Sequence, residues 1–380
     1  MPTTVYIDIT SSGNNTDGGG YTTLTQAATN YTGNKDLVTA DVLLVFRIHD
    51  DFGGFISEGS SGPAFNSLGY TTDATRYIVI EAATGDECTY VETAGARLSC
   101  NNRFGQVFET NKSVKVIARN IVIKQDTGGQ TGGEAAVACH KIEGCLVVSN
   151  RSDETLLAVM RIPNSSSETE HVIDSMFVRS GGHANGPAFV GVNDDPTVVK
   201  RCCIIGSYLD AGTVTTGDST YTLEDTVIYN TAGATWVNAS AKTVTADNNA
   251  FSDATGVGTN KQLSIGTDQF TDYASGDYST ASGSTMSTNG IGIILSNPTI
   301  TIDQASLTPG ATISGTYSNF ASTPTSPAVL TDSNSNTLNV TVTVTGTSSA
   351  GTFSGTMPSL PTTGNTSNFL LFGTVNVALD

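Results

Sequence analysis

Two pairs of adjacent aspartates come nearest, in residue type and spacing, to catalytic chemistry. They are Asp50-Asp51 and Asp194-Asp195. Two carboxyl groups held about 5 to 10 Å apart can hydrolyse a glycosidic bond, one as acid and the other as base or nucleophile. If the chain is an enzyme, we expect the catalytic residues to be Asp194, Asp195, His183 and Arg201. If it binds calcium, Asp194 and Asp195 are the expected ligands.

The same aspartates also have a structural interpretation. Neighbouring side chains on a strand point to opposite faces of a sheet, which would separate the two carboxylates of a pair. In a loop, an Asp side chain commonly accepts hydrogen bonds from the backbone of a turn. Active-site carboxylates usually converge from separate segments. The sequence therefore favours a function without catalysis and keeps catalysis as the alternative, and His49 and His183 are interpreted as surface or turn residues rather than general bases.

A single tryptophan offers a candidate binding residue. Trp236 lies in NTAGATWVNASAK, seven residues after Tyr229. Exposed side by side, the two rings could stack against a sugar. A buried Trp236 would instead fill the core or a contact between subunits.

Composition excludes several classes of partner. The chain has 380 residues and a formal net charge of −18, which argues against nucleic acid as a ligand. We expect no membrane insertion, because no apolar run reaches 18 residues, and no secretory signal, because the first ten residues lack basic and apolar regions. No cofactor is expected: Gly18–Gly20 is not followed by the lysine of a phosphate loop. The six cysteines form no C-x-x-C pair, so they are expected to be small buried side chains rather than zinc ligands.

A degenerate repeat in the middle of the chain determines the expected fold. Each copy has an apolar anchor, two or three mostly polar or small residues, and then two or three apolar residues. The copies are VIARNIVI, KIEGCLVV, VIDSMFV, VVKRCCII, YTLEDTVIY and TVTADNNAF, with expected anchors at Ile117, Ile142, Ile173, Val199, Leu223 and Val244. The anchors recur every 21 to 31 residues. Such a period with such short strands predicts a right-handed parallel β-helix, in which each coil pairs with the coils above and below it.

We expect this β-helix to span residues 42–296 with about ten coils. Residues 149–171 and 179–197 are long intervals between copies, and such excursions commonly build the binding face of a solenoid. The end of a solenoid needs a cap, because it would otherwise expose apolar core and an unpaired strand. Residues 1–41 are expected to supply it: a strand, a loop, and a short helix over 22–31 that faces inward through Leu24, Ala27, Ala28 and Tyr31.

Four segments resemble parts of the pectate-lyase-like β-helix superfamily. They are VYIDITSSGNNTDGGGYTTLTQAA, TRYIVIEAATG, VKVIARNIVIKQ and FTDYASGDYSTASGSTMSTNGIGI, the last resembling the closing cap. The resemblance covers about residues 4–295 and implies the fold, whereas the superfamily includes lyases, hydrolases, viral spikes and adhesins. Its pectin hydrolases carry a double-aspartate motif followed by a histidine motif. Here NDD follows GGHANG, so the order is reversed, and no arginine follows Arg201.

Residues 297–380 have a different pattern. Threonines alternate with apolar residues between turn signals, which predicts a small antiparallel β-sandwich resembling an immunoglobulin-like module. The segment contains no Lys, Arg or His, and its acidic residues are Asp303, Asp332 and Asp380. Such a surface cannot attract phosphate or sulfate groups and suits packing against protein or weak sugar contacts.

A β-helix joined to an immunoglobulin-like module resembles virion proteins of tailed bacteriophages. We therefore expect a structural protein on the particle surface, made in the host cytoplasm: a head decoration, a head fibre, or a tail accessory or spike protein. The implied partners are other capsid or tail proteins, further copies of the chain in a homotrimer, and host surface polysaccharide. The first alternative is a polysaccharide lyase or glycoside hydrolase with a β-helix cleft; the second is a bacterial surface adhesin.

The cysteines give a test of the repeat alignment. Cys145 and Cys202 fall in one column two coils apart, which separates them by about 9.6 Å. A disulfide tolerates at most about 7 Å between Cα atoms, so both are expected to be free thiols.

Overall fold

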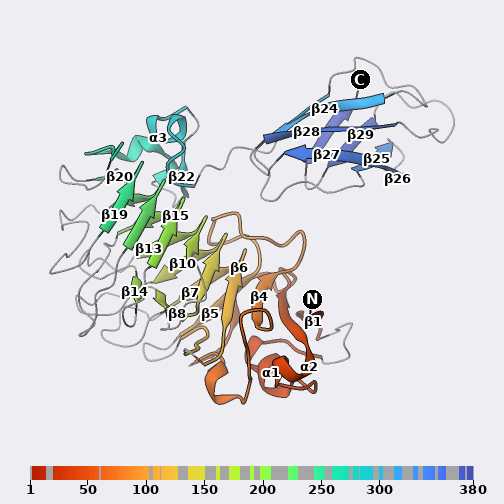
Figure 1. The fold of residues 1–380 in the computed structure, drawn as a ribbon, viewed down its shortest axis with the longest axis vertical. Helices are drawn as coiled ribbons and strands as arrows, with labels where there is room; N and C mark the ends of the chain where they lie inside the picture. Colours follow the sequence, from red (N-terminus) through yellow and green to blue (C-terminus); the bar gives the residue numbers. More distant parts are fainter. Residues whose placement is uncertain are drawn as a thin grey trace. The chain divides into compact units, whose positions relative to one another are not determined.

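The computed structural model divides the chain into two compact units, Met1–Ile294 and Leu295–Asp380 (Figure 1). It describes residues 2–13, 20–59, 61–101, 106–111, 113–126, 136–149, 160–162, 171–179, 189–191, 197–206, 221–229, 244–252, 259–273, 277–281, 283–293, 299–302, 312–318, 328–332, 337–346, 350–356, 368–372 and 375–379. Within these ranges strands predominate and helices are short, so the expected all-β class is confirmed.

Two long parallel sheets dominate the first unit. The nine-stranded sheet has the order β1 (Thr3–Ile9), β2 (Val42–Ile48), β4 (Ile78–Ala82), β6 (Val116–Arg119), β9 (Lys141–Glu143), β12 (Val172–Ile173), β15 (Thr197–Lys200), β17 (Tyr221–Glu224) and β19 (Val244–Asp247). The eight-stranded sheet has the order β3 (Ile56–Ser57), β5 (Arg97–Cys100), β7 (Val122–Gln125), β10 (Leu146–Ser149), β13 (Met176–Arg179), β16 (Cys203–Ile205), β18 (Val227–Tyr229) and β20 (Ala250–Phe251). A third parallel sheet contains β8 (Val137–Ala138), β11 (Met160–Ile162) and β14 (Phe189–Gly191).

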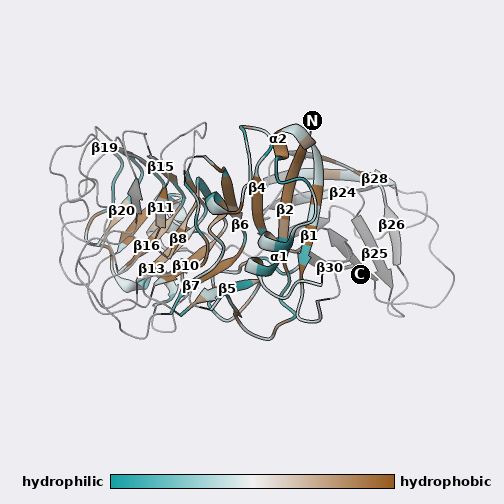
Figure 2. Ribbon diagram, turned by 90° about the horizontal axis from the view of Figure 1, so that it is seen from below, coloured by the Kyte–Doolittle hydropathy of each residue, from teal (hydrophilic) through white to brown (hydrophobic). Residues whose placement is uncertain are grey.

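The chain alternates between the two long sheets. From β6 to β20, each strand of the nine-stranded sheet leads through a two-residue bend into a strand of the eight-stranded sheet. We call such a pair of strands with its bend a rung. The six described rungs are β6–β7, β9–β10, β12–β13, β15–β16, β17–β18 and β19–β20. Inward-facing apolar residues of successive rungs form one continuous core, and Figure 2 shows brown apolar residues along these strands.

The register corrects three of the six expected anchors. The column that contains Ile142, Val199 and Leu223 continues through Ala118, Val172 and Ala246. The expected anchors Ile117 and Ile173 are each one residue out of this column, and Val244 is two residues out. The alternation was hidden because both Ile117 and Ile173 are apolar and buried although they lie outside the inward column.

The described stack is shorter than about ten coils. Starting from β2, the nine-stranded sheet contributes eight strands within the described residues. Beyond β19, isolated bridges pair Asp247 with Thr259 and Ala250 with Gln262 and begin one further turn of the chain.

The predicted N-terminal helix is confirmed as α1 (Leu24–Asn30). Leu24, Ala27 and Ala28 are fully buried in the main core, and Tyr31 follows as the C-terminal cap residue, half-buried against that core. A second helix, α2 (Leu37–Ala40), and a single 3₁₀ turn, η1 (Phe65–Ser67), lie in the same end of the unit.

We call the last part of the first unit, residues 259–273, 277–281 and 283–293, the closing segment. It contains η2 (Thr267–Gln269), the antiparallel strands β21 (Phe270–Asp272) and β22 (Asp277–Thr280), and α3 (Thr285–Thr288). Its apolar residues do not join the main core. They form a second buried cluster with the outward-facing residues of the eight-stranded sheet.

The second unit consists of two four-stranded antiparallel sheets. One has the order β23 (Thr299–Ile302), β24 (Thr312–Ser318), β28 (Ala350–Thr356) and β27 (Val342–Gly346). The other has the order β26 (Thr337–Val340), β25 (Ala328–Asp332), β29 (Asn368–Phe372) and β30 (Val375–Leu379). Val342 and Phe353 are buried.

Candidate functional site

The structure describes two of the six predicted site residues. Arg201 lies in the bend before β16, and Tyr229 ends β18 on the following rung. His183, Asp194, Asp195 and Trp236 lie outside the described residues. The candidate site is therefore built from the bends and from the outer face of the eight-stranded sheet, where Arg201 and Tyr229 lie.

Each bend begins with a residue in the left-handed region. These residues are Asn120, Gly144, Asp174, Arg201, Asp225 and Asn248, with φ between 46° and 65°. Glycine adopts this conformation without strain, and Asn and Asp tolerate it better than other residues. Arg201 is the exception in the column, so its bend needs a compensating interaction.

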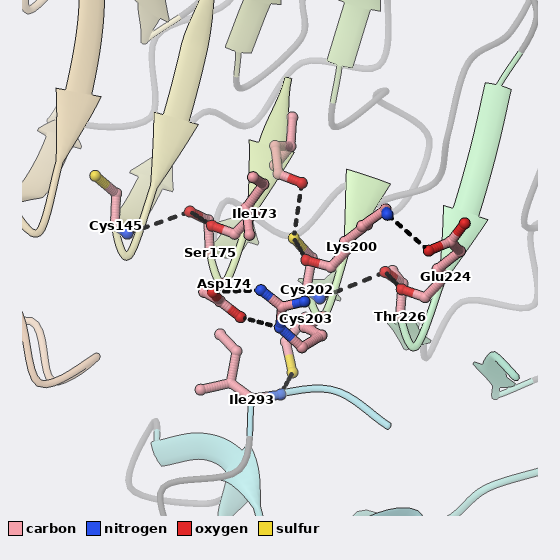
Figure 3. Close-up of polar contacts among 12 residues, drawn as sticks. Cys145, Ile173, Asp174, Ser175, Lys200, Cys202, Cys203, Glu224, Thr226 and Ile293 are labelled. Atoms are coloured by element: carbon pink, nitrogen blue, oxygen red, sulfur yellow. Dashed lines mark hydrogen bonds and ion pairs between the residues drawn. The ribbon is translucent and has the colours of Figure 1, made fainter. Parts of the chain in front are cut away.

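An ion pair supplies that interaction. The Arg201 guanidinium contacts the Asp174 carboxylate of the preceding rung through two bonds, Nε to Oδ1 at 2.6 Å and Nη2 to Oδ2 at 2.7 Å (Figure 3). The hydrogen bonds to Asp174 raise the pKa of Arg201. One rung further on, Lys200 Nζ lies 2.9 Å from the Glu224 carboxylate. Arg201 therefore joins two rungs and is engaged in the structure of the bend.

The second residue of each bend points into the interior and forms a buried polar column. From β10 onward its members are Cys145, Ser175, Cys202, Thr226 and Asn249, each at most 1% exposed. The backbone N–H of Cys145 donates to Ser175 Oγ, that of Cys202 to Thr226 Oγ1 and that of Thr226 to Asn249 Oδ1. The hydroxyls of Ser175 and Thr226 donate back to the carbonyl two residues before them. The column thus provides hydrogen-bond partners for backbone N–H and C=O groups at the bends, where these groups have no partner in the sheets.

The cysteines in and near this column are free thiols. The six cysteines form no disulfide, and Cys145 and Cys202 occupy one column two rungs apart with Ser175 between them, as predicted. Burial raises the pKa of Cys203 to about 12 and that of Cys88 to about 11. Burial also raises the pKa of Cys145 well above its ordinary value. A thiol must ionise to act as a nucleophile, so these sulfurs are packing and hydrogen-bonding groups.

We expect the five buried thiols to resist alkylation in the folded protein, whereas Cys88 is only partly buried. Iodoacetamide should add at most one carbamidomethyl group, at Cys88, to the native chain at pH 8 and six after unfolding in guanidinium, because burial keeps the other five thiols protonated and covered. Intact-mass spectrometry with and without denaturant measures this. Uptake of two carbamidomethyl groups fewer after denaturation would reveal a disulfide, and a disulfide between Cys145 and Cys202 would contradict the register.

Tyr229 belongs to the second apolar cluster. It is 8% exposed, and its ring centre lies 5.2 Å from that of Phe270, with the rings nearly perpendicular, and 5.2 Å from that of Tyr273. Burial raises the pKa of Tyr229. Its ring therefore packs against the closing segment, which leaves no open aromatic platform at this residue.

The closing segment is attached to the bends as well as to the sheet. Ile293 N–H donates to Cys203 Sγ at 3.4 Å, and Gly292 N–H donates to the Asp225 carbonyl at 2.7 Å. Gly292 has a φ of 78°, and a Cβ there would lie 2.7 Å from Val227 Cγ2. The closing segment lies so close to the rungs here that a side chain would not fit, and the backbone conformation also favours glycine.

The other aspartate pair, Asp50-Asp51, has structural contacts. Asp50 forms an ion pair with the buried Arg97 at 2.7 Å. Asp51 accepts hydrogen bonds from the backbone N–H and the hydroxyl of Ser11, both at 3.0 Å. These contacts agree with the structural interpretation of the pair, because the Asp51 carboxylate accepts hydrogen bonds from the turn that follows β1.

His49 links the first two strands of the stack with the segment after β4. Its Nε2 lies 3.2 Å from the buried Asp8 carboxylate, which Arg47 also contacts at 2.8 Å. Its Nδ1 lies 3.5 Å from an Asp86 oxygen. The imidazole is held between two carboxylates, that of Asp8 on the level before its own strand and that of Asp86 on the level after it.

The bend residues were missed by sequence reasoning, although a signal was present. Each bend lies in a similar tripeptide: RNI, EGC, IDS, KRC, EDT or DNN. Five of the six begin with a charged residue, and each continues with a left-handed residue and a buried residue before an apolar run. The aligned repeats contain this column, but a search for apolar anchors does not detect it.

The described parts of the chain contain neither a metal-ligating cluster nor a long apolar helix. No three His, Cys, Asp or Glu residues among them are grouped so as to hold a metal ion. No helix in those ranges is long and apolar enough to cross a bilayer. The calcium hypothesis for Asp194 and Asp195 concerns residues outside the described ranges.

Comparison of the chain with protein-family models, with curated proteins and with solved structures finds no match. Its function therefore has to be inferred from the residues and contacts themselves.

Proposed function

We propose that the chain is a structural display protein of a tailed bacteriophage. Its first unit would be a right-handed parallel β-helix and its second an immunoglobulin-like β-sandwich. The protein would lie on the particle surface, as a head decoration, head fibre, or tail accessory or spike protein, and would stabilise the particle or adhere to host glycans.

The observation that carries this proposal is the repeated rung. Six rungs follow one another with the same two-residue bend, and the nine-stranded sheet alone extends about 40 Å along the stacking direction. A continuous core and paired backbones make such a stack stiff in that direction, as a molecule that projects from a particle requires. Each two-residue bend connects the two strands of a rung directly, whereas the intervals between rungs are long enough to form surface excursions.

The contacts of the predicted site residues also favour a structural function. Arg201 is paired with Asp174, and Tyr229 is buried by the closing segment. Asp50 is paired with Arg97, and Asp51 accepts hydrogen bonds from Ser11 after β1. The second unit supports display in a different way, because its sequence has no basic residue and few acids. A weakly charged, Thr-rich surface suits contact with another protein of the particle.

The direct test is the location of the chain. Particles purified from the source culture are examined by cryo-electron microscopy and mass spectrometry, and density for this chain is expected at fixed symmetric positions on the head or tail. Particles without the chain, together with depolymerisation of a host polysaccharide by the purified protein, would overturn the proposal. Loss of that activity in Asp194→Asn and His183→Ala variants would then assign the enzyme alternative.

Assembly provides a second test. As a homotrimer, the purified protein is expected to elute from size exclusion with a light-scattering mass three times the 39.3 kDa of one chain. A monomer at micromolar concentration would contradict the homotrimer. The location test would then decide whether a single chain is displayed.

A further inference from the structure

The last outward position of each strand in the nine-stranded sheet forms a single column of mostly charged residues. Reading along the sheet, the column is Asp8, Arg47, Glu81, Arg119, Glu143, Ile173, Lys200, Glu224 and Asp247. The sign alternates at every step from Asp8 to Glu143, and again from Lys200 to Glu224. We call this column the charge ladder.

Neighbouring members of the charge ladder interact. The closest atoms lie 2.8 Å apart between Arg47 and Asp8, 3.5 Å between Arg119 and Glu143, and 2.9 Å between Lys200 and Glu224. Burial raises the pKa of Glu81, and the positive charges of Arg119 and Arg47 on either side oppose that shift. Glu81 is therefore held between two cations.

The apolar pattern alone leaves one kind of misfolding open. A slip of one residue between neighbouring strands would turn every inward side chain outward, so burial excludes it. A slip of two residues preserves the alternation and exchanges one inward apolar residue for another. The charge ladder opposes that slip, because a two-residue shift of a strand removes its charge from the opposite charges above and below.

We infer that the charge ladder is an electrostatic register lock, which selects one alignment of successive rungs among those that the apolar core permits. Its position strengthens this function. In every rung the ladder residue immediately precedes the left-handed bend residue, so alignment at the ladder also aligns the bends and the buried polar column. The inference does not depend on the proposed function.

Arg119 provides the sharpest test, because it lies between Glu81 and Glu143. Arg119→Glu would create three successive negative charges about 4.8 Å apart, whereas Arg119→Gln removes the charge at nearly the same size. In Arg119→Glu with Glu143→Lys, position 119 regains an opposite charge. The introduced lysine would face the neutral Ile173 on its other side, and it would lie beside Lys141, whose Nζ is 3.5 Å from the Glu143 carboxylate in the wild type. This double variant separates the loss of alternation from the loss of Arg119 itself.

The cysteines next to β9 report register. Cys139 and Cys145 flank this strand and are fully buried, so a shift of β9 against β6 would uncover one of them. Each variant is unfolded, refolded at low salt, treated with iodoacetamide and mapped by peptide mass spectrometry. We expect Arg119→Glu to yield a population alkylated at Cys139 or Cys145 but not at Cys203, and the wild type and Arg119→Gln to yield none.

Salt and charge restoration complete the test. The alkylated population should fall at 1 M NaCl, where the Debye length is about 3 Å, and in the double variant. Hydrogen exchange of β6 and β9 amides should be about 10-fold faster in Arg119→Glu than in Arg119→Gln. Equal behaviour of the two single variants, or even alkylation of all six cysteines, would overturn the register lock. If Arg119→Glu does not refold, Lys200→Glu repeats the test with one unfavourable neighbour, Glu224, and Cys202 as its reporter.

Discussion

Replacing Glu58 by alanine is expected to lower the free energy of unfolding of the N-terminal end by about 2 to 4 kcal/mol, because it strands buried hydrogen-bond donors. Glu58 is 8% exposed and lies just after β3. Its carboxylate accepts from the backbone N–H groups of Leu24 and Thr25 at 2.8 and 2.9 Å, and from the Thr25 hydroxyl at 2.6 Å. These donors form the first turn of α1, so one side chain fastens the capping helix to the stack.

The measurement is hydrogen exchange of the α1 and β1 amides in Glu58→Ala, with the amides of β17 and β18 as an internal reference. The α1 and β1 amides should lose protection, and the distant rungs should keep it, because the lost contacts are confined to one end. Wild-type protection throughout α1 would show that its apolar residues hold the helix without Glu58.

Glu58→Gln tests the charge separately and has a definite pH dependence. Burial raises the pKa of Glu58 against the opposing effect of its hydrogen bonds. The folded protein therefore binds this proton more tightly than the unfolded chain, and the resulting stability is greatest below the unfolded pKa and is lost as pH rises through the folded pKa. Glutamine does not titrate, so the deficit of Glu58→Gln relative to the wild type should grow as pH falls from 7 to 5. A deficit that shrinks over this range would contradict the direction of the shift.

Much of the fold was predictable because burial repeats along the chain. The apolar residues of α1 and the column of Cys145 and Cys202 came directly from spacing. The anchors failed at Ile117 and Ile173, because apolar residues also lie outside the inward column of the nine-stranded sheet. The anchor at Val244 missed the column by two residues. Periodicity reports which residues avoid water, but it does not distinguish the inward face of a strand from a covered outward face.

The closing segment illustrates the same limit. Its resemblance to a cap predicts a place at the end of the stack. Its apolar residues Met286, Ile291 and Ile293 also pack on the outward face of the eight-stranded sheet, which the resemblance did not indicate. That face is apolar through residues such as Met176 and Val227. An apolar outward face could be recognised only once the register was known, so neither the cover nor the burial of Tyr229 could be deduced from the sequence.

Replacing Asn249 by leucine is expected to lower the free energy of unfolding by about 2 to 5 kcal/mol, because it leaves two buried backbone groups without partners. Asn249 is 1% exposed. Its Oδ1 accepts from the Thr226 N–H at 2.8 Å, and its Nδ2 donates to the Leu223 carbonyl at 3.0 Å. Leucine has a similar size but can neither accept nor donate a hydrogen bond. The polar column would therefore lose the two hydrogen bonds that Asn249 makes at its end.

Thr226→Val is the matched control, one rung earlier in the same column. It preserves shape and removes one hydroxyl, which donates to the Glu224 carbonyl at 2.9 Å and accepts a longer bond from the Cys202 N–H at 3.4 Å. We expect a smaller loss, about 1 to 2 kcal/mol, because only one strong hydrogen bond disappears. Hydrogen exchange of the β17 to β20 amides measures both losses locally. If Asn249→Leu were as stable as the wild type, apolar burial would outweigh backbone satisfaction in the bends, and the polar column would be a consequence of the stack rather than a support of it.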